Sequence, residues 1–369
     1  MDAGKFLDIL EDLGGAFYTG VPDSLLSPFI DAIVDRYGIG ARHIVAANEG
    51  AAVGLAAGHY LATGNPAVVY MQNSGIGNAM NPICSLLHEK VYAIPVIFVI
   101  GWRGEPGTKD EPQHVFQGEA TLRMLELVEI PYAIVAKDSN LSQDIANFKH
   151  HIKNGRSVAF VVKKGALVNG SEKKYANEAL LSREEALKLI LGSAKPDDVF
   201  VCTTGKLSRE VHEYRESVGE GHGRDFLTVG SMGHSLMIAL GIALAKPERR
   251  VFCLDGDGSM LMHMGGVAVA GVHSPQNLVH VVINNGAHET VGGLPAVSRK
   301  LELGGIAMAC GYKQKCLAET EAELGAALAA IKDGPVFIEV VCNLLSRADL
   351  GRPSYSPIEN KKLFMETLK

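Results

Sequence analysis

The sequence predicts an α/β protein with two doubly wound domains, each built around a mostly parallel sheet. Short runs of apolar, β-branched and aromatic residues alternate with helical stretches in both halves of the chain. The runs are continuously apolar rather than alternating, which is typical of parallel strands buried on both faces. Segments rich in glycine, serine and asparagine follow many of these runs, at the strand ends where doubly wound sheets bind ligands.

About six strands are expected in each half of the chain. The runs of the first half span 15–20, 42–47, 67–72, 92–101, 132–136 and 158–164. Those of the second half span 198–205, 226–230, 249–256, 277–285, 311–316 and 336–343. The two halves have similar sizes, but no sequence repeat relates them.

A polar segment separates the two halves. Residues 165–193 are polar at first and then amphipathic, and the motif Ser-Arg-Glu-Glu predicts a helix that is capped by Ser182. The boundary therefore falls near 170–180, and we expect domains of 1–175 and 176–369.

Composition narrows the classes of function. Hydrophobic residues make up 47% of the 369 residues and the net charge is −6, so no basic field favours nucleic acid or an anionic membrane. The six cysteines form no CxxC pair, which indicates reduced core residues. The amino-terminal stretch lacks a signal-peptide charge pattern, and no apolar run is long enough to span a membrane. We therefore expect a cytoplasmic enzyme or binding protein with a small-molecule ligand.

The motif GDG, centred on Asp257, ends one predicted strand, and Asn284 and Asn285 end the next. The intervening residues suffice for one helix and a return strand, and a right-handed crossover would bring both strand ends to one sheet edge. The Asp257 carboxylate, the Asn285 amide oxygen and the Ala287 carbonyl oxygen are hard ligands that suit Mg²⁺ or Ca²⁺. The alternative is a helix cap at Asp257 and two turn-forming asparagines.

The combination GDGSM…VVINN matches the metal–diphosphate signature of thiamine diphosphate enzymes. The resemblance covers the whole chain and implies a pyrimidine-binding domain at 1–175 and a diphosphate-binding domain at 176–369, without the middle domain of larger relatives. This short layout, with YTGVPDSLL, GWRGEPGTKDEPQH and NNGAHETVGG, is closely similar to the phosphonopyruvate decarboxylase family. Sulfopyruvate decarboxylases are the nearest relatives.

The resemblance also implies roles for individual residues. Glu49 would hydrogen-bond the cofactor's aminopyrimidine, although a first-turn helix glutamate is also favoured by the helix dipole alone. Met232 would support the bent shape of the cofactor; the alternative is an ordinary core methionine. Lys206 lies where the family contacts the diphosphate, although a lysine is unusual there, and the alternative is a surface lysine. The full expected set of cofactor-binding residues is Gly75, Thr204, Gly205, Lys206, Ser231, Met232, Gly256, Gly258 and Ser259.

Substrate groups follow less directly from the sequence. Arg103 is the best-placed cation for an anionic tail, because its guanidinium suits tetrahedral anions; a solvated loop arginine is the alternative. Asp23 is either a proton donor or an N-cap. His114 occupies the region where decarboxylases of this family carry active-site histidines, and His288 is a second candidate.

The expected reaction is decarboxylation of 3-phosphonopyruvate to phosphonoacetaldehyde and CO₂ in phosphonate biosynthesis, with thiamine diphosphate and Mg²⁺ as cofactors. The resemblance also implies a homo-oligomer, at least a dimer, whose subunits share active sites. The alternatives are a sulfopyruvate decarboxylase and a thiamine diphosphate-binding protein without catalysis. An oxidoreductase that binds NAD(P) is disfavoured, because no GxGxxG follows a strand and opens a helix.

Overall fold

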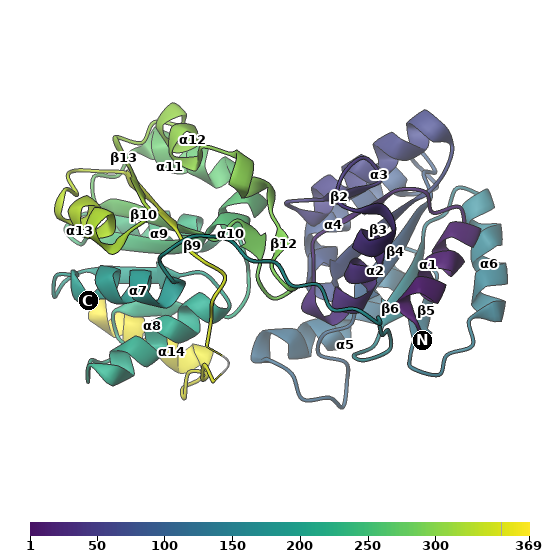
Figure 1. The fold of residues 1–369 in the computed structure, drawn as a ribbon, viewed down its shortest axis with the longest axis horizontal. Coiled ribbons are helices and arrows are strands. Elements are labelled where there is room, and N and C mark those ends of the chain that lie inside the picture. Colours follow the sequence, from purple (N-terminus) through teal and green to yellow (C-terminus); the bar gives the residue numbers. More distant parts are fainter. Residues whose placement is uncertain (348) are drawn as a thin grey trace. The chain divides into compact units, whose positions relative to one another are not determined.

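A computed structural model describes residues 1–347 and 349–369. The chain forms two units, of which unit 1 comprises 1–174 and 288–294, and unit 2 comprises 175–287 and 295–369. Each unit contains one six-stranded parallel sheet covered by helices (Figure 1). A short segment of the second half, 288–294, therefore belongs to unit 1.

The sheet of unit 1 has the strand order β2-β1-β3-β4-β6-β5, and every pairing in it is parallel. Its strands are β1 (Tyr18–Gly20), β2 (His43–Val45), β3 (Ala67–Gln72), β4 (Val96–Gly101), β5 (Tyr132–Val135) and β6 (Val158–Val162). The order reverses between β1 and β3, and such a switch point is where doubly wound sheets bind ligands.

Helices cover both faces of this sheet. They are α1 (Ala3–Asp12), η1 (Ser24–Leu26), α2 (Ser27–Tyr37), α3 (Glu49–Thr63), η2 (Asn73–Gly75), α4 (Ile76–Pro82), η3 (Ile83–Leu87), α5 (Pro112–Leu127) and α6 (Ser142–Lys153). Alternate residues of β3 face opposite layers: Val69 and Met71 share a core cluster with Ala52 of α3, whereas Tyr70 packs edge-on against Phe29 of α2. The continuously apolar strands are thus buried on both sides, as the sequence predicts.

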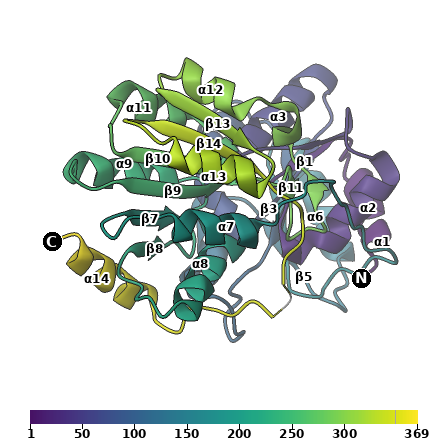
Figure 2. The same ribbon diagram turned by 60° about the vertical axis from the view of Figure 1, so that its left-hand side comes forward.

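Unit 2 repeats this strand order. Its sheet runs β13-β14-β10-β9-β7-β8, which read backwards is the same succession as in unit 1 (Figure 2). Its strands are β7 (Val199–Cys202), β8 (Asp225–Leu227), β9 (Val251–Gly256), β10 (Leu278–Asn284), β13 (Gln314–Ala318) and β14 (Val336–Val341). The remaining strands, β11 (Ala287–His288) and β12 (Leu294–Pro295), form a separate two-stranded sheet. The two units share a topology that their sequences do not reveal.

The helices of unit 2 also lie on both faces of its sheet. They are α7 (Arg183–Gly192), α8 (Lys206–Ser217), α9 (Ser235–Ala245), α10 (Asp257–Met262), α11 (Gly265–His273), η4 (Val297–Lys300), α12 (Leu303–Ala309), α13 (Glu321–Ala329) and α14 (Pro357–Thr367). One core cluster joins α7, α8 and α13 to the sheet, and the other joins α9, α11 and α12. Ser182 caps α7 in a capping box with Glu185, as predicted.

All the strands predicted from the sequence are present, but two local expectations were wrong. The single helix expected between the GDG motif and Asn284 is two helices, because the chain leaves helical geometry at His263 and two glycines, with poor helix propensity, follow. The strand expected at 311–316 lies at Gln314–Ala318, because Tyr312 turns into the core. Among the described residues, no helix combines the length and apolar character needed to cross a membrane.

Candidate active site

Glu49 is the first residue of α3 and is almost fully buried. Asn48 caps the helix by accepting a hydrogen bond from the Ala51 amide, so the Glu49 carboxylate is available for other contacts. Nδ2 of Asn78 donates to Oε2 of Glu49 at 2.8 Å. Asn78 ends the segment NSGIGN (73–78), which also contains Gly75, so the structure brings together two residues that the sequence assigns to the cofactor.

A second group of polar side chains lies at the carboxyl ends of β1, β3 and β4. Asp23 accepts hydrogen bonds from Gln72 at 2.9 Å and from the Leu25 amide at 3.2 Å. Its Oδ1 lies 3.6 Å from Nε of Arg103, whose guanidinium also donates to the Ser24 hydroxyl. Burial raises the pKa of Asp23, and Gln72 and the charge of Arg103 oppose this effect. Asp23 is thus both the predicted cap and a buried acid.

Arg103 is not the solvated loop arginine that the sequence leaves open as an alternative. Its side chain is only 22% exposed, because it folds back on Asp23. Its backbone is fixed as well, since Asn73 accepts from the Arg103 amide at 3.1 Å and donates to the Arg103 carbonyl at 2.8 Å. The guanidinium is therefore held in place next to a buried carboxylate before any substrate arrives.

The loop that follows Arg103 is closed by Asp110 and His114. Nδ1 of His114 lies 2.8 Å from Oδ1 of Asp110, and Oδ2 of Asp110 accepts from the Gly104 amide at 2.9 Å. Although burial opposes it, hydrogen bonds from His114 and from backbone amides lower the pKa of Asp110 to about 2. Asp110 therefore fixes the orientation of the His114 ring, and sequence reasoning overlooked it.

In unit 2, Asp257 opens α10 directly after β9 and is buried. The Ser298 hydroxyl donates to its Oδ2, and burial raises the pKa of Asp257 to about 6 against this hydrogen bond. Among the described residues, no lysine, arginine or histidine forms an ion pair with it. A buried carboxylate without a cationic partner is costly, so the site favours a bound cation.

The turn after the neighbouring strand carries further oxygen atoms that could act as metal ligands. β10 pairs in parallel with β9, with Ile283 opposite Gly256, so both strands end at the same sheet edge, as predicted. Oδ1 of Asn285 accepts from the Ala287 amide at 3.0 Å, which shapes the turn after β10. Asn284 is engaged elsewhere, because it donates to Glu339 at 2.8 Å. The donor set of carboxylate, amide and carbonyl oxygens fits Mg²⁺.

Backbone and hydroxyl groups form a cradle beside Asp257. Oγ of Ser259 accepts from the Gly233 amide and from Thr203, each at 3.0 Å, and thereby links three strand ends. A β-carbon on Gly258 would lie 3.5 Å from Cε of Met232, so this methionine faces the start of α10. Nζ of Lys206 lies 2.6 Å from the Ser346 hydroxyl. The expected cofactor-binding residues of unit 2 therefore come from the same sheet edge.

Segment 288–294 carries His288 and belongs to unit 1. The His288 carbonyl accepts from the amides of Val291 and Gly293, and this turn connects β11 to β12. Burial lowers the pKa of His288 to about 4, so the ring is neutral at neutral pH. His288 can therefore hydrogen-bond a ligand but does not supply a positive charge.

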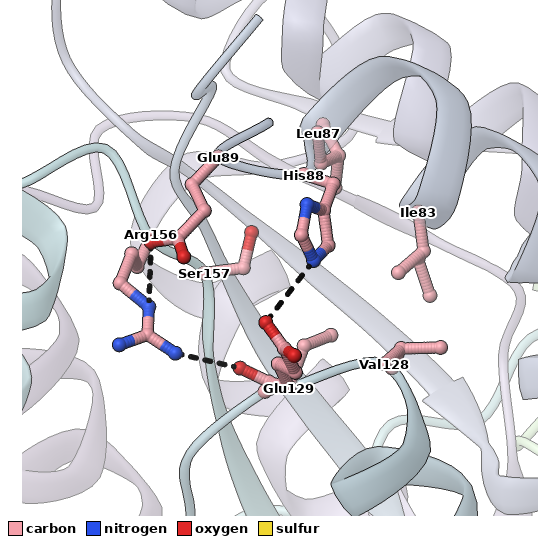
Figure 3. Close-up of a pocket in the computed structure, with 9 residues that line it drawn as sticks. Ile83, Leu87, His88, Glu89, Val128, Glu129, Arg156 and Ser157 are labelled. Atoms are coloured by element: carbon pink, nitrogen blue, oxygen red, sulfur yellow. Dashed lines mark hydrogen bonds and ion pairs between the residues drawn. The ribbon is translucent and has the colours of Figure 1, made fainter. Parts of the chain in front are cut away.

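One surface pocket contains none of the predicted residues (Figure 3). It is lined by Ile83, Leu87, His88, Glu89, Val128, Glu129, Ile130, Arg156 and Ser157. Two polar contacts cross it: Nε2 of His88 lies 3.5 Å from Glu129, and Arg156 forms an ion pair with Glu89 at 3.2 Å. Its lining includes neither Glu49 nor Asp257, the buried acids at the two sheet edges.

Comparison with known proteins agrees with this geometry. The N-terminal TPP binding domain of thiamine pyrophosphate enzymes matches residues 3–124, and the C-terminal TPP binding domain matches residues 203–340. A phosphonopyruvate decarboxylase of Streptomyces viridochromogenes is 33% identical over 96% of this chain and 92% of its own. The chain belongs to the phosphonopyruvate decarboxylase family. This is a family of thiamine pyrophosphate (thiamine diphosphate) enzymes, and its members are carboxy-lyases.

Two further relatives span nearly the whole chain. A phosphonopyruvate decarboxylase of Streptomyces hygroscopicus is 33% identical over 99% of this chain and 94% of its own. A sulfopyruvate decarboxylase of Methanosarcina acetivorans is 25% identical over 99% of this chain and 97% of its own. The phosphonopyruvate decarboxylase family thus accounts for both units, and thiamine diphosphate is the cofactor that their family models share.

Proposed function

We propose that this chain decarboxylates 3-phosphonopyruvate to phosphonoacetaldehyde and CO₂, using thiamine diphosphate and Mg²⁺, within phosphonate biosynthesis. The observation that carries the proposal is the 33% identity with two phosphonopyruvate decarboxylases over 96% and 99% of the chain. Two buried acids support it. Glu49 in unit 1 can hydrogen-bond the aminopyrimidine of the cofactor, and Asp257 in unit 2 can bind the metal ion that holds its diphosphate.

Unit 1 would provide the pyrimidine-binding part of the site. Thiamine diphosphate supplies an electron sink for the pair released when the bond from the carboxylate carbon to the carbonyl carbon breaks. Glu49 would hydrogen-bond the aminopyrimidine, and Asn78 would hold one carboxylate oxygen of Glu49 in place. Gly75 would allow the close approach of backbone and ring.

Unit 2 would provide the diphosphate-binding part. Asp257, Asn285 and the Ala287 carbonyl would hold Mg²⁺, which would neutralise the buried Asp257 charge and bind diphosphate oxygens. The backbone amides at the start of α10 would donate to the same diphosphate. The other unit 2 residues assigned to the cofactor are Thr204, Gly205, Lys206, Ser231, Met232, Gly256, Gly258 and Ser259.

The substrate groups would come from the loops of unit 1. Arg103 would bind the phosphonate, and His288 would donate a hydrogen bond to the substrate. One proton must replace CO₂ on the carbonyl carbon, and Asp23 or His114 would deliver it, since burial raises the pKa of Asp23 and the Asp110 carboxylate orients His114. The functional form would be a homo-oligomer, at least a dimer, with shared active sites.

The test is turnover of three substrates by metal-stripped protein supplied with thiamine diphosphate and Mg²⁺. We expect kcat/KM for phosphonopyruvate to exceed those for sulfopyruvate and pyruvate, and no turnover when either cofactor is omitted. A preference for sulfopyruvate would replace the proposal with the activity named for the Methanosarcina relative. Tight cofactor binding without turnover of any of the three would favour a binding protein without catalysis.

A further inference from the structure

The carboxyl-terminal half of α8 carries a cluster of potential metal ligands away from the residues assigned to the cofactor. His212 and Glu216 lie four residues apart on α8, so they share one face of the helix. His222, from the loop before β8, stacks on His212 with ring centres 4.4 Å apart. Oε1 of Glu216 lies 2.6 Å from Nε2 of His222 and 4.0 Å from Nε2 of His212.

Hydrogen bonds among these residues leave polar atoms unsatisfied. Nδ1 of His212, Nδ1 of His222 and the Tyr355 hydroxyl are buried and have no hydrogen-bond partner within the described part of the chain. The Tyr355 ring closes the cluster, with its centre 5.3 Å from that of His212 and 5.0 Å from that of His222. Buried unpaired polar atoms are rare in proteins, and three at one place indicate a missing ligand or ordered water.

We propose that His212, Glu216 and His222 bind a transition-metal ion of the Zn²⁺ class. One donor atom from each residue lies within 4.8 Å of the other two. Two imidazoles and one carboxylate form a common zinc ligand set, with metal–donor distances of about 2.0–2.2 Å. The donors would draw together by side-chain rotation alone. Because the Glu216 side chain is 58% exposed, water can occupy the fourth position.

The loop that carries His222 is anchored independently of the cluster. Arg215 is fully buried and donates to both carboxylate oxygens of Asp225, at 2.8 and 2.9 Å. Arg215 and Arg224 also bind Glu220, at 2.6 and 2.7 Å. His222 is therefore held near α8 before a metal binds, which lowers the conformational cost of binding.

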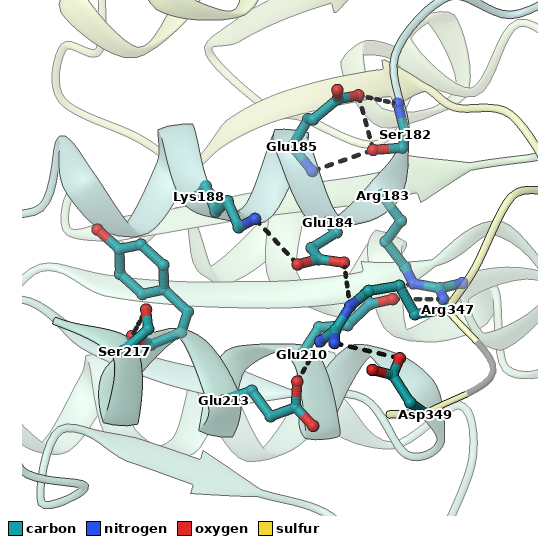
Figure 4. Close-up of polar contacts among 11 residues, drawn as sticks. Ser182, Arg183, Glu184, Glu185, Lys188, Glu210, Glu213, Ser217, Arg347 and Asp349 are labelled. Atoms are coloured by element: carbon teal, nitrogen blue, oxygen red, sulfur yellow. Dashed lines mark hydrogen bonds and ion pairs between the residues drawn. The ribbon is translucent and has the colours of Figure 1, made fainter. Parts of the chain in front are cut away.

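Further contacts fix the position of α8 itself. Arg183 of α7 binds Glu210 in a buried pair, with nitrogen–oxygen distances of 2.6 and 2.7 Å. Arg347 lies between Glu184 of α7 and Glu213 of α8, so it ties the carboxyl-terminal segment to both helices (Figure 4). The cluster thus stands on a rigid helix, as a preorganised metal site requires.

The proposed site differs from the Mg²⁺ site in place and in chemistry. Lys206, assigned to the cofactor, begins α8, and Glu216 lies ten residues further on, or about 15 Å along the helix. Imidazole ligands favour Zn²⁺ over Mg²⁺, whereas the oxygen ligands around Asp257 favour Mg²⁺. One chain would therefore bind both metals, each at its own site, without competition between them.

The test measures Zn²⁺ affinity in the holoprotein. Tag-free protein is stripped with chelator, reloaded with thiamine diphosphate and excess Mg²⁺, and titrated with Zn²⁺ against a chromophoric chelator. We expect one Zn²⁺ per chain, and affinity at least about tenfold weaker in His222→Gln and Glu216→Gln. If His222→Gln fails to fold, Glu216→Gln still tests the proposal, because the Glu216 side chain is more than half exposed and its substitution should not disturb the fold.

The control variant is His150→Gln, because the rings of His150 and His151 are also adjacent, 6.1 Å apart on α6, a helix of unit 1 that carries none of the proposed ligands. It should bind Zn²⁺ as the wild type does. With Co²⁺ as a probe, the wild type should show the strong visible absorption of a tetrahedral site, and His222→Gln should not. No Zn²⁺ binding by the wild type, or loss of binding in His150→Gln but not in His222→Gln, would overturn the proposal.

Discussion

Gly75 lies so close to Glu49 that a β-carbon at position 75 would stand 2.5 Å from Oε1 of Glu49. The other carboxylate oxygen, Oε2, accepts the hydrogen bond from Asn78. The motif NSGIGN therefore holds one oxygen of the glutamate and leaves room for the other. The sequence assigns Gly75 to cofactor binding, and the structure adds a second reason for a glycine at this position, which is room for the Glu49 side chain.

The first prediction concerns Glu49 itself. Glu49→Gln should abolish decarboxylation and leave thiamine diphosphate binding largely intact, because the amide keeps the shape of the side chain but is a far weaker hydrogen-bond acceptor. The direct measurement is hydrogen–deuterium exchange at C2 of the bound cofactor. Exchange as fast as in the wild type would show that Glu49 does not activate the cofactor.

The second prediction uses Gly75 to move Glu49 without changing its chemistry. Gly75→Ala should lower kcat by about tenfold or more, because the new methyl group must displace the carboxylate. Gly77→Ala is the matched control, since a β-carbon there meets nothing within 4 Å and alanine favours the helix. Equal kcat values for the two variants would mean that the close contact with Gly75 does not position Glu49.

The third prediction separates metal binding from helix capping at Asp257. Asp257→Asn should lose Mg²⁺-dependent cofactor affinity while the apoprotein unfolds at no lower temperature, because the buried charge has only hydroxyl and backbone partners. Ser298→Ala, which removes only the hydroxyl partner, should retain most of the affinity. Calorimetric titration and thermal unfolding measure both quantities. A large loss of stability with undiminished affinity would favour the capping role.

The fourth prediction concerns substrate choice. Arg103→Ala should raise KM for phosphonopyruvate about tenfold to a hundredfold more than KM for pyruvate, which lacks the anionic tail. Ser24→Ala, which removes one partner of the guanidinium, should shift selectivity in the same direction but less. Steady-state kinetics with both substrates decides. Equal losses for the two substrates would mean that Arg103 serves mainly to hold Asp23.

Much of the fold follows from the sequence because buried parallel strands are continuous apolar runs. The pairing of β9 with β10 also follows, since the connection between Asp257 and Asn284 is long enough for one crossover. The ion pair of Arg103 with Asp23 does not, because 80 residues and two different strand ends separate the two side chains. Ser298 likewise reaches Asp257 from a distant 3₁₀ turn that carries no motif.

The contacts of His43, the first residue of β2, determine which of its ring nitrogens carries the proton. His43 is fully buried, with Nδ1 3.1 Å from the Gly38 carbonyl and Nε2 2.9 Å from the Tyr70 hydroxyl. A carbonyl can only accept, so Nδ1 carries the proton and Nε2 accepts from Tyr70. Burial lowers the pKa of His43 from 6.5 to about 4. The folded chain therefore keeps this ring neutral over a range where the unfolded chain protonates it.

The fifth prediction follows from this difference in pKa. Above pH 6.5 the ring is neutral in both the folded and the unfolded state, so it does not change the free energy of unfolding. As the pH falls from 6.5 to 4, the unfolded state binds a proton that the folded state does not. His43 alone should therefore lower the free energy of unfolding of unit 1 by up to about 3 kcal/mol across this range. Urea unfolding at pH 7.5, 5.5 and 4 measures it. In His43→Gln, which is less stable at pH 7.5, this part of the pH dependence should vanish, whereas Tyr70→Phe keeps the titrating ring and should retain it. An unchanged slope in His43→Gln would assign the acid sensitivity to other groups.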